Sequence, residues 1–147
     1  MENRFETFTL LISKINRNIK KIKTNKMAKY NLRSLHVSCL YYLYVNKALT
    51  ASEICEKCEE DKGAVSKALD YLENNEYIVC DSKHIKRYNS PFTLTSKGVV
   101  VGKEITDHIN LVLENINIYL NETERNAFYQ SLNKISLGLN KISNQIN

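Results

Sequence analysis

The stretch LTASEICEKCEEDKGAVSKALDYLEN, residues 49–74, decides the fold of this chain. Thr50 and Glu53 have the spacing of a capping box, in which each side chain satisfies an amide at the start of a helix. Asp61 can cap a second helix, whose apolar positions recur at helical spacing: Val65, Leu69 and Leu72. The stretch therefore predicts a short helix, a turn and a second short helix, which together make a helix-turn-helix unit.

A small β-hairpin is predicted directly after this unit. Residues 77–80 and 92–95 have the composition of short strands, and the polar segment 81–90 joins them before Pro91. A hairpin in this position is called a wing. Its expected tip carries three cations, which are Lys83, Lys86 and Arg87.

Long amphipathic helices are predicted at both ends of the chain. The first carries an apolar stripe at spacings of three and four: Phe5, Phe8, Leu11, Ile12, Ile15, Ile19 and Ile22. Residues 96–120 predict another helix, and Asn121 with Glu124 begins the last one. The last helix carries a similar stripe: Phe128, Leu132, Ile135, Leu139, Ile142 and Ile146. A partner subunit could bury both apolar stripes, and we favour this interpretation. The alternative is that both stripes pack on the core of the same chain.

The composition is that of one ordinary globular domain with a basic N-terminal part. The 147 residues have a formal net charge of +5, and residues 1–36 hold nine Lys or Arg against two acidic residues. Between Lys14 and Arg33 there is no acid, which indicates either a solvated helix face or a flank that contacts phosphates. No apolar run approaches a membrane span and residues 1–5 do not resemble a signal peptide, so we expect a cytoplasmic protein without membrane contact.

The reactive side chains do not form an enzyme or metal motif. Cys55 and Cys58 make a Cys-x-x-Cys, but no second pair follows at zinc spacing. We interpret Cys58 as a small core residue beside Ile54, and metal or redox sensing as the less favoured alternative. The histidines lie far apart, and no nucleophile elbow or phosphate loop is present. We expect no enzyme activity, cofactor or metal.

The order of these elements resembles the MarR family of bacterial regulators over nearly the whole chain. Residues 32–43 resemble the family's second helix, and residues 49–54 resemble the Leu-Thr-x-Ser-Glu-Leu phrase that opens its helix-turn-helix. Residues 61–73 resemble its recognition helix, and Leu94-Thr95-x-x-Gly98 resembles the phrase that follows its wing. The resemblance implies a mainly α winged helix-turn-helix fold. Residues 32–98 would form the DNA-binding region, and residues 1–24 and 99–147 the helical dimerisation region.

The chain departs from the family pattern at several positions. Lys86-Arg87-Tyr88 stands where the family usually has Asp-x-Arg, and Arg87 is expected to serve instead. Glu60 replaces an apolar residue and Glu76 replaces Gly. Cys55 and Cys58 stand where Ala and Leu are usual, which agrees with a packing role.

The resemblance implies a homodimeric transcriptional regulator that reads a pseudo-palindromic operator in double-stranded DNA. We expect a repressor that a small-molecule effector releases from DNA. The alternative is a winged-helix module that binds proteins without contacting DNA. The second helix of the unit would enter the major groove, while the start of the first helix and the wing would meet phosphates or the minor groove. The expected DNA-binding residues are Thr50, Ser52, Lys62, Gly63, Ser66, Lys67, Lys83, Lys86 and Arg87. The expected effector-binding residues are Tyr30, His36, Tyr41 and Tyr44.

Overall fold

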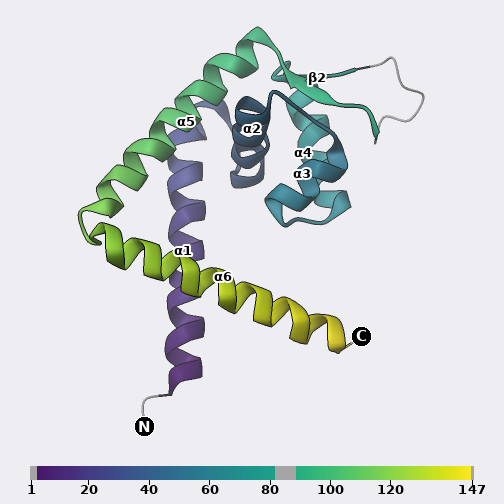
Figure 1. The fold of residues 1–147 in the computed structure, drawn as a ribbon. Coiled ribbons are helices and arrows are strands. Elements are labelled where there is room, and N and C mark those ends of the chain that lie inside the picture. Colours follow the sequence, from purple (N-terminus) through teal and green to yellow (C-terminus); the bar gives the residue numbers. More distant parts are fainter. Residues whose placement is uncertain (1–2, 82–88, 147) are drawn as a thin grey trace. The chain divides into compact units, whose positions relative to one another are not determined.

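A computed structural model describes residues 3–81 and 89–146 of the chain (Figure 1). The chain divides into two compact units, residues 1–106 and 107–147. The first unit contains most of the elements: α1 (Arg4–Met27), η1 (Ala28–Tyr30), α2 (Ser34–Asn46), β1 (Ala48–Leu49), α3 (Ala51–Cys58), α4 (Lys62–Asn74), β2 (Ile78–Cys80) and β3 (Phe92–Leu94). Helix α5 (Ser96–Asn117) begins in the first unit and ends in the second, which also contains α6 (Glu122–Gln145). The predicted mainly α fold with a small sheet is confirmed.

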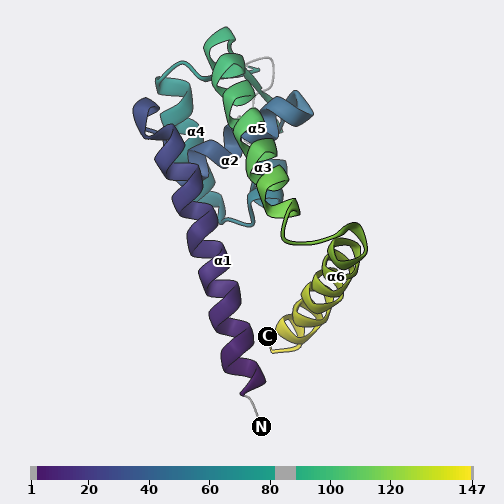
Figure 2. The same ribbon diagram turned by 90° about the vertical axis from the view of Figure 1, so that its left-hand side faces the viewer.

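Helix α2 is the centre of the first unit. It contacts α1 on one side, and α3, α4 and β3 on others (Figures 1 and 2). Its fully buried residues are Val37, Cys39, Leu40 and Leu43. The buried face of α4 meets it with Val65, Ala68, Leu69 and Leu72. The apolar character of residues 37–45 therefore reflects a helix with neighbours on several sides.

Side-chain caps begin α3, α4 and α6 where the sequence predicts them. At the start of α3, the Glu53 amide donates to the Thr50 hydroxyl (3.3 Å) and the Thr50 amide donates to the Glu53 carboxylate (2.7 Å). The Asp61 carboxylate accepts a hydrogen bond from the amide of Ala64 at the start of α4 (2.8 Å). Asn121 and Glu124 form a second reciprocal box before α6. Each cap satisfies amides that have no partner within the helix, and so defines its first residue.

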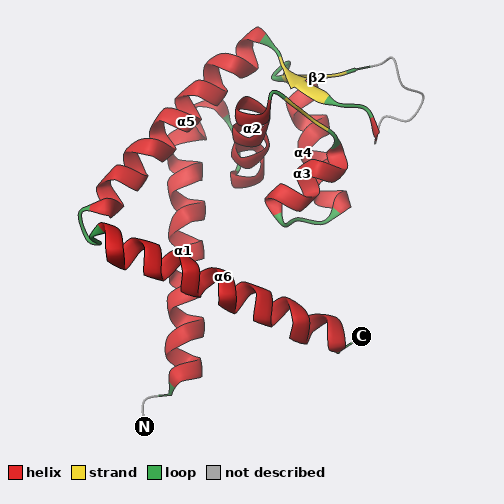
Figure 3. Ribbon diagram, viewed as in Figure 1, coloured by secondary structure: helices red, strands yellow, loops and turns green. Residues whose placement is uncertain are grey.

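The sheet has three antiparallel strands in the order β1-β3-β2 (Figure 3). Strands β2 and β3 pair Val79 with Thr93, as expected for the two sides of a wing. On the other side of β3, Ala48 also pairs with Thr93. Strand β1 was not predicted, because two residues are too short to show an alternating pattern. The predicted tip residues Lys83, Lys86 and Arg87 lie outside the described residues.

The turn between α4 and β2 contains Glu76, at a position where the resembled pattern has Gly. Glu76 has a φ of 62°, in the left-handed region that costs residues with a Cβ but not glycine. Its carbonyl oxygen accepts a hydrogen bond from the Thr95 hydroxyl at 2.6 Å, which ties the turn to the start of α5. The position therefore requires a left-handed backbone whatever residue occupies it.

We expect Glu76→Gly to raise the free energy of unfolding by up to about 1 kcal/mol, because glycine adopts this backbone without the Cβ penalty. Glu76→Ala is the control, since it removes the charge but keeps the Cβ. Urea unfolding at one protein concentration measures both variants. An equal gain from Glu76→Ala would assign the effect to the charge rather than to the backbone.

The long helices expose their apolar stripes in the single chain. On α1, Phe5 is 77% exposed and Ile15 48%, and on α6, Leu139 is 52% exposed and Ile142 56%. No residue of α6 is buried. No helix in residues 3–81 and 89–146 is long and apolar enough to cross a membrane.

Candidate nucleic-acid interface

Helix α4 has one buried face and one exposed face. The buried face packs on α2 and α3 through the residues given above. The exposed face carries Lys62, Gly63, Ser66 and Lys67, which are spaced so that they line one side of the first two turns. These four residues are expected DNA contacts, and the structure brings them together on one surface.

Gly63 leaves the backbone of this surface uncovered. A Cβ at this position would lie 3.2 Å from the Asp61 carboxylate oxygen that caps α4. An added Cβ would therefore crowd only this cap and no buried residue of the core. The bare backbone instead lets a ligand approach the first turn of α4 closely.

At the start of α3, Thr50 and Ser52 differ in their surroundings. The Thr50 hydroxyl donates to the Glu53 carboxylate at 3.0 Å, in addition to its role in the capping box. These hydrogen bonds with Thr50 lower the pKa of Glu53 and keep it charged. Ser52 is half-buried in the first turn of α3. The amide and the hydroxyl of Thr50 both donate to Glu53. An anion at this helix start would therefore contact Ser52 more readily than Thr50.

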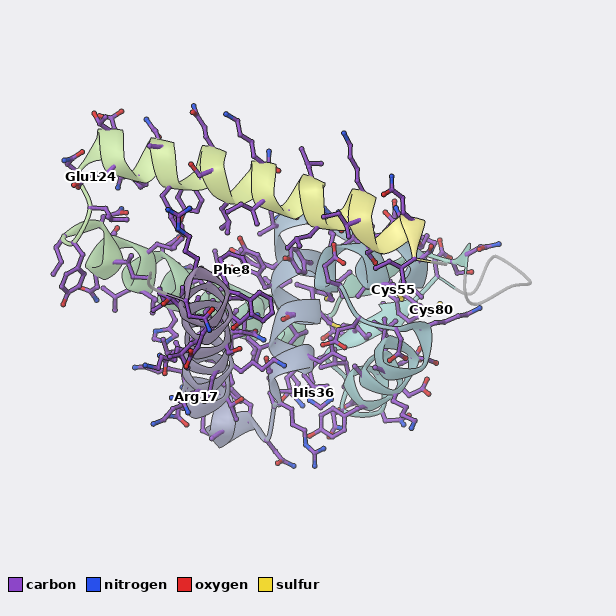
Figure 4. All side chains as sticks on the ribbon, turned by 90° about the horizontal axis from the view of Figure 1, so that it is seen from below. Phe8, Arg17, His36, Cys55, Cys80 and Glu124 are labelled. Carbon is purple, nitrogen blue, oxygen red and sulfur yellow. The ribbon has the colours of Figure 1, made fainter. Side chains whose placement is uncertain are left out.

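Two cations of α1 and η1 have side-chain partners within the first unit. The ammonium of Lys23 donates to the Ser38 hydroxyl at 3.0 Å, and that of Lys29 pairs with Glu104 at 2.6 Å. The remaining basic positions of α1 are exposed, as Arg17 is (Figure 4): Arg4, Lys14, Arg17, Lys20, Lys21 and Lys26. Two side chains of the basic run, Lys23 and Lys29, therefore have partners within the first unit.

The four residues expected to bind an effector contact different neighbours. The Tyr30 hydroxyl donates to Glu104 at 2.7 Å, and Tyr44 packs against Gly102 of α5. The rings of Tyr41 and Tyr42 meet edge to face at 5.2 Å. The structure thus places three of the four on α2 and one on η1, each with a partner inside the first unit.

The side chain of His36 on α2 contacts helix α4. Its ring stacks on Tyr71 with centroids 4.3 Å apart, and its Nδ1 accepts a hydrogen bond from the Arg33 amide. Burial lowers the pKa of His36, and the positive charge of Arg33 lowers it further. The Tyr71 hydroxyl also donates to the carbonyl of Asn31 at 3.0 Å. This positioning role of Tyr71 was missed, because no local pattern links residues forty positions apart.

Within residues 3–81 and 89–146, no group of three or more His, Cys, Asp or Glu side chains could hold a metal ion. No disulfide joins the four cysteines, which all lie in the described part of the chain: Cys39, Cys55, Cys58 and Cys80.

Comparisons with known proteins agree with this geometry. Residues 35–112 match the family model described as "Winged helix DNA-binding domain". No curated protein sequence matches the chain.

Solved structures of similar proteins, one of them a MarR family regulator, have the same fold. A MarR family regulator from Neisseria meningitidis is 16% identical, with a TM-score of 0.85 over 99% of each chain. S. aureus MepR in complex with DNA is 20% identical, with a TM-score of 0.81 over 93% of this chain and 99% of that one. Bordetella bronchiseptica BpsR is 18% identical, with a TM-score of 0.75 over 89% of this chain and 99% of that one. The expected resemblance is confirmed, and the chain belongs to the winged helix DNA-binding domain family, with the fold of the MarR regulators.

Proposed function

We propose that this chain is a sequence-specific DNA-binding transcriptional regulator of the MarR type. The observation that carries the proposal is the exposed face of α4, where Lys62, Gly63, Ser66 and Lys67 lie opposite a fully buried face. A helix held this way by α2 and α3 offers its first turns to the major groove. The solved structure of the similar S. aureus MepR includes DNA, which supports this reading.

Each part of the surface would contact a different part of the duplex. Lys67 can reach the O6 and N7 acceptors of guanine, and Ser66 can bond a base or a phosphate. Ser52 with the amides of α3 would hold a phosphate, and Thr50 would position that helix start. The wing cations Lys83, Lys86 and Arg87 would follow the adjacent minor groove or its phosphates.

We further propose that the protein acts as a homodimer through its terminal helices. The apolar stripes of α1 and α6 are exposed over several turns, and water contact along such stripes is unfavourable. A twofold dimer would present two α4 helices to half-sites about one helical turn apart. Its operator would then be a rough palindrome.

We also propose that a small molecule releases the protein from DNA. The DNA binding of the similar BpsR is regulated by 6-hydroxynicotinic acid, which supports a comparable arrangement here. The proposed effector contacts remain Tyr30, His36, Tyr41 and Tyr44. Of these, His36 stacks on Tyr71 of α4, so a ligand that displaced its ring would act on the DNA-facing helix directly.

Lys67→Ala tests direct base readout. We expect it to cost about 1–3 kcal/mol on the operator and little on random DNA, because a lysine bonded to a base edge distinguishes sequences. The operator is first obtained as the fragments that the purified protein retains from random-sequence DNA. Fluorescence anisotropy then measures both affinities. Lys141→Ala on α6 removes the same charge and should change neither affinity. Equal losses on the two DNAs for Lys67→Ala would show a backbone contact only.

Arg87→Ala tests the wing. We expect it to weaken binding to operator and random DNA alike, because a phosphate contact carries no sequence information. The salt dependence of the affinity should flatten by about one unit of slope for each half-site. The same anisotropy titrations across a salt series measure this change. If neither Arg87→Ala nor Lys67→Ala alters binding, these surfaces do not face DNA, and a protein-binding winged helix becomes the better proposal.

A further inference from the structure

The segment that joins α1 to α2, called the 28–33 turn, is anchored by burial and by hydrogen bonds. Met27 and Leu32 are fully buried, and the Leu32 amide donates to the Met27 carbonyl at 3.3 Å. Between them, Asn31 has a left-handed φ of 56°, and its amide donates to the carbonyl of Ala28 at 2.9 Å. These contacts fix the path of the backbone through the turn.

Helix α4 is bound to the 28–33 turn through Tyr71. The Tyr71 hydroxyl donates to the Asn31 carbonyl at 3.0 Å, and the Tyr71 ring stacks on His36 of α2 with an interplanar angle of 8°. The His36 ring is itself held by the Arg33 amide, which donates to its Nδ1 at 3.1 Å. Tyr71 therefore uses both its hydroxyl and its ring to attach α4 to the start of α2.

The same turn is bound to α5. The Lys29 ammonium pairs with one oxygen of the Glu104 carboxylate at 2.6 Å, and the Tyr30 hydroxyl donates to the other oxygen at 2.7 Å. The hydrogen bonds from Lys29 and Tyr30 lower the pKa of Glu104, which keeps its carboxylate charged. Three consecutive residues, Lys29, Tyr30 and Asn31, thus connect α5 to α4.

The place of Tyr71 on α4 makes these contacts relevant to DNA binding. Tyr71 follows Lys67 by four residues, so the two side chains lie one turn apart on the same side of the helix. The apolar residues that pack α4 on α2 and α3 make contacts that have no preferred direction. A hydrogen bond and a ring stack have a defined geometry, and they limit the rotation of α4 about its own axis.

We propose that Tyr71 positions α4 for DNA binding, and that the 28–33 turn couples Tyr71 to Glu104 of α5. Tyr71 fixes the direction in which Lys67 leaves α4. Glu104 acts at the other end of the connection, because it holds the two side chains by which the turn is bound to α5. A change at Glu104 is therefore transmitted to the DNA-facing side of α4. This inference rests on the proposed function, since it concerns how α4 meets the operator.

Tyr71→Phe tests the positioning role, because it removes the hydroxyl and keeps the ring. We expect the affinity for the operator to fall about threefold to tenfold, the effect of one hydrogen bond, while the affinity for random DNA changes by less than about twofold. A hydrogen bond that only stabilised the fold would lower the free energy of unfolding and leave the operator affinity of the folded protein unchanged. Fluorescence anisotropy measures the affinities, and urea unfolding measures the stability. Tyr119→Phe removes the same group from a ring that is 80% exposed, and it should change neither affinity.

A double-mutant cycle tests the coupling to α5. Glu104→Ala releases the turn, so we expect it to weaken operator binding by itself and to reduce the effect of Tyr71→Phe to less than about twofold. Glu114→Ala is the control, since it removes a carboxylate from an exposed position further along α5. Its effect on operator affinity should multiply with that of Tyr71→Phe, as expected for independent sites.

The outcomes separate this inference from the proposed function. Failure of the wild-type protein to bind any DNA would contradict the proposed function, and the positioning role with it. Operator binding that is unchanged in the folded Tyr71→Phe variant, or reduced equally on operator and random DNA, would overturn the positioning role alone. Losses from Tyr71→Phe and Glu104→Ala that simply multiply would overturn the coupling. If Tyr71→Phe does not fold, Glu104→Ala must still weaken operator binding and spare random DNA, or the inference is wrong.

Discussion

Gly98→Ala is expected to lower the free energy of unfolding by at least about 3 kcal/mol, because no space exists for a Cβ at this position. An ideal Cβ on Gly98 would lie 2.0 Å from the carbonyl oxygen of Tyr77 and 3.0 Å from its carbonyl carbon. Both atoms belong to the backbone, so no side-chain rotation relieves the overlap. The start of α5 would have to move away from the chain entering β2, which would also disturb the Thr95 hydrogen bonds to Glu76 and Tyr77.

Two other glycines provide matched controls for this substitution. Gly138 of α6 has nothing within 4 Å of an added Cβ, so Gly138→Ala should stabilise the helix by about 0.5–1 kcal/mol. Gly102 faces the side chain of Tyr44 at 3.0 Å, so Gly102→Ala should lie between the two. Urea unfolding at one fixed protein concentration measures all three, since the stability of a dimer depends on concentration. Gly98→Ala with wild-type stability would contradict the close approach of α5 to Tyr77.

Replacing Leu132 and Leu139 together by glutamate is expected to separate the proposed homodimer into monomers or unfold it. Leu139 is 52% exposed in the single chain and Leu132 is half-buried, and both belong to the apolar stripe of α6. Burial of two unpaired carboxylates in an apolar interface costs several kcal/mol, more than dimer contacts of ordinary size can offset. Light scattering measures the mass. The affinity for the two-half-site operator should fall with it, because each monomer binds one half-site.

The neighbouring asparagines give a control of equal charge. Asn133→Glu with Asn140→Glu places two glutamates one residue further along α6, and both asparagines are exposed and lie outside the apolar stripe. This variant should remain a dimer with wild-type affinity for the operator. A well-folded dimer from the leucine double variant would place the interface elsewhere.

The local elements of the fold were predictable from short patterns in the sequence. Thr50 with Glu53, and Asn121 with Glu124, begin helices through hydrogen bonds between residues three positions apart. The buried face of α4 follows from Val65, Leu69 and Leu72, whose spacing places them on one side of a helix. The same helical spacing places the expected DNA contacts Lys62, Ser66 and Lys67 on the opposite, exposed face.

Other features depend on tertiary packing alone. Strand β1 exists because β3 lies beside residues 48–49, and two residues carry no periodicity of their own. The Tyr30 hydroxyl meets Glu104 across 74 positions, and Tyr71 reaches Asn31 across 40.

The side-chain partners of α4 show the difference most clearly. The sequence by itself determined that residues 62–74 form a helix with one apolar face, through the Asp61 cap and the spacing of Val65, Leu69 and Leu72. Only the packing of α4 on α2 decided that Tyr71 stacks on His36. Caps and helix faces depend on residues within four positions of each other, whereas side-chain partners between helices depend on how the whole core packs.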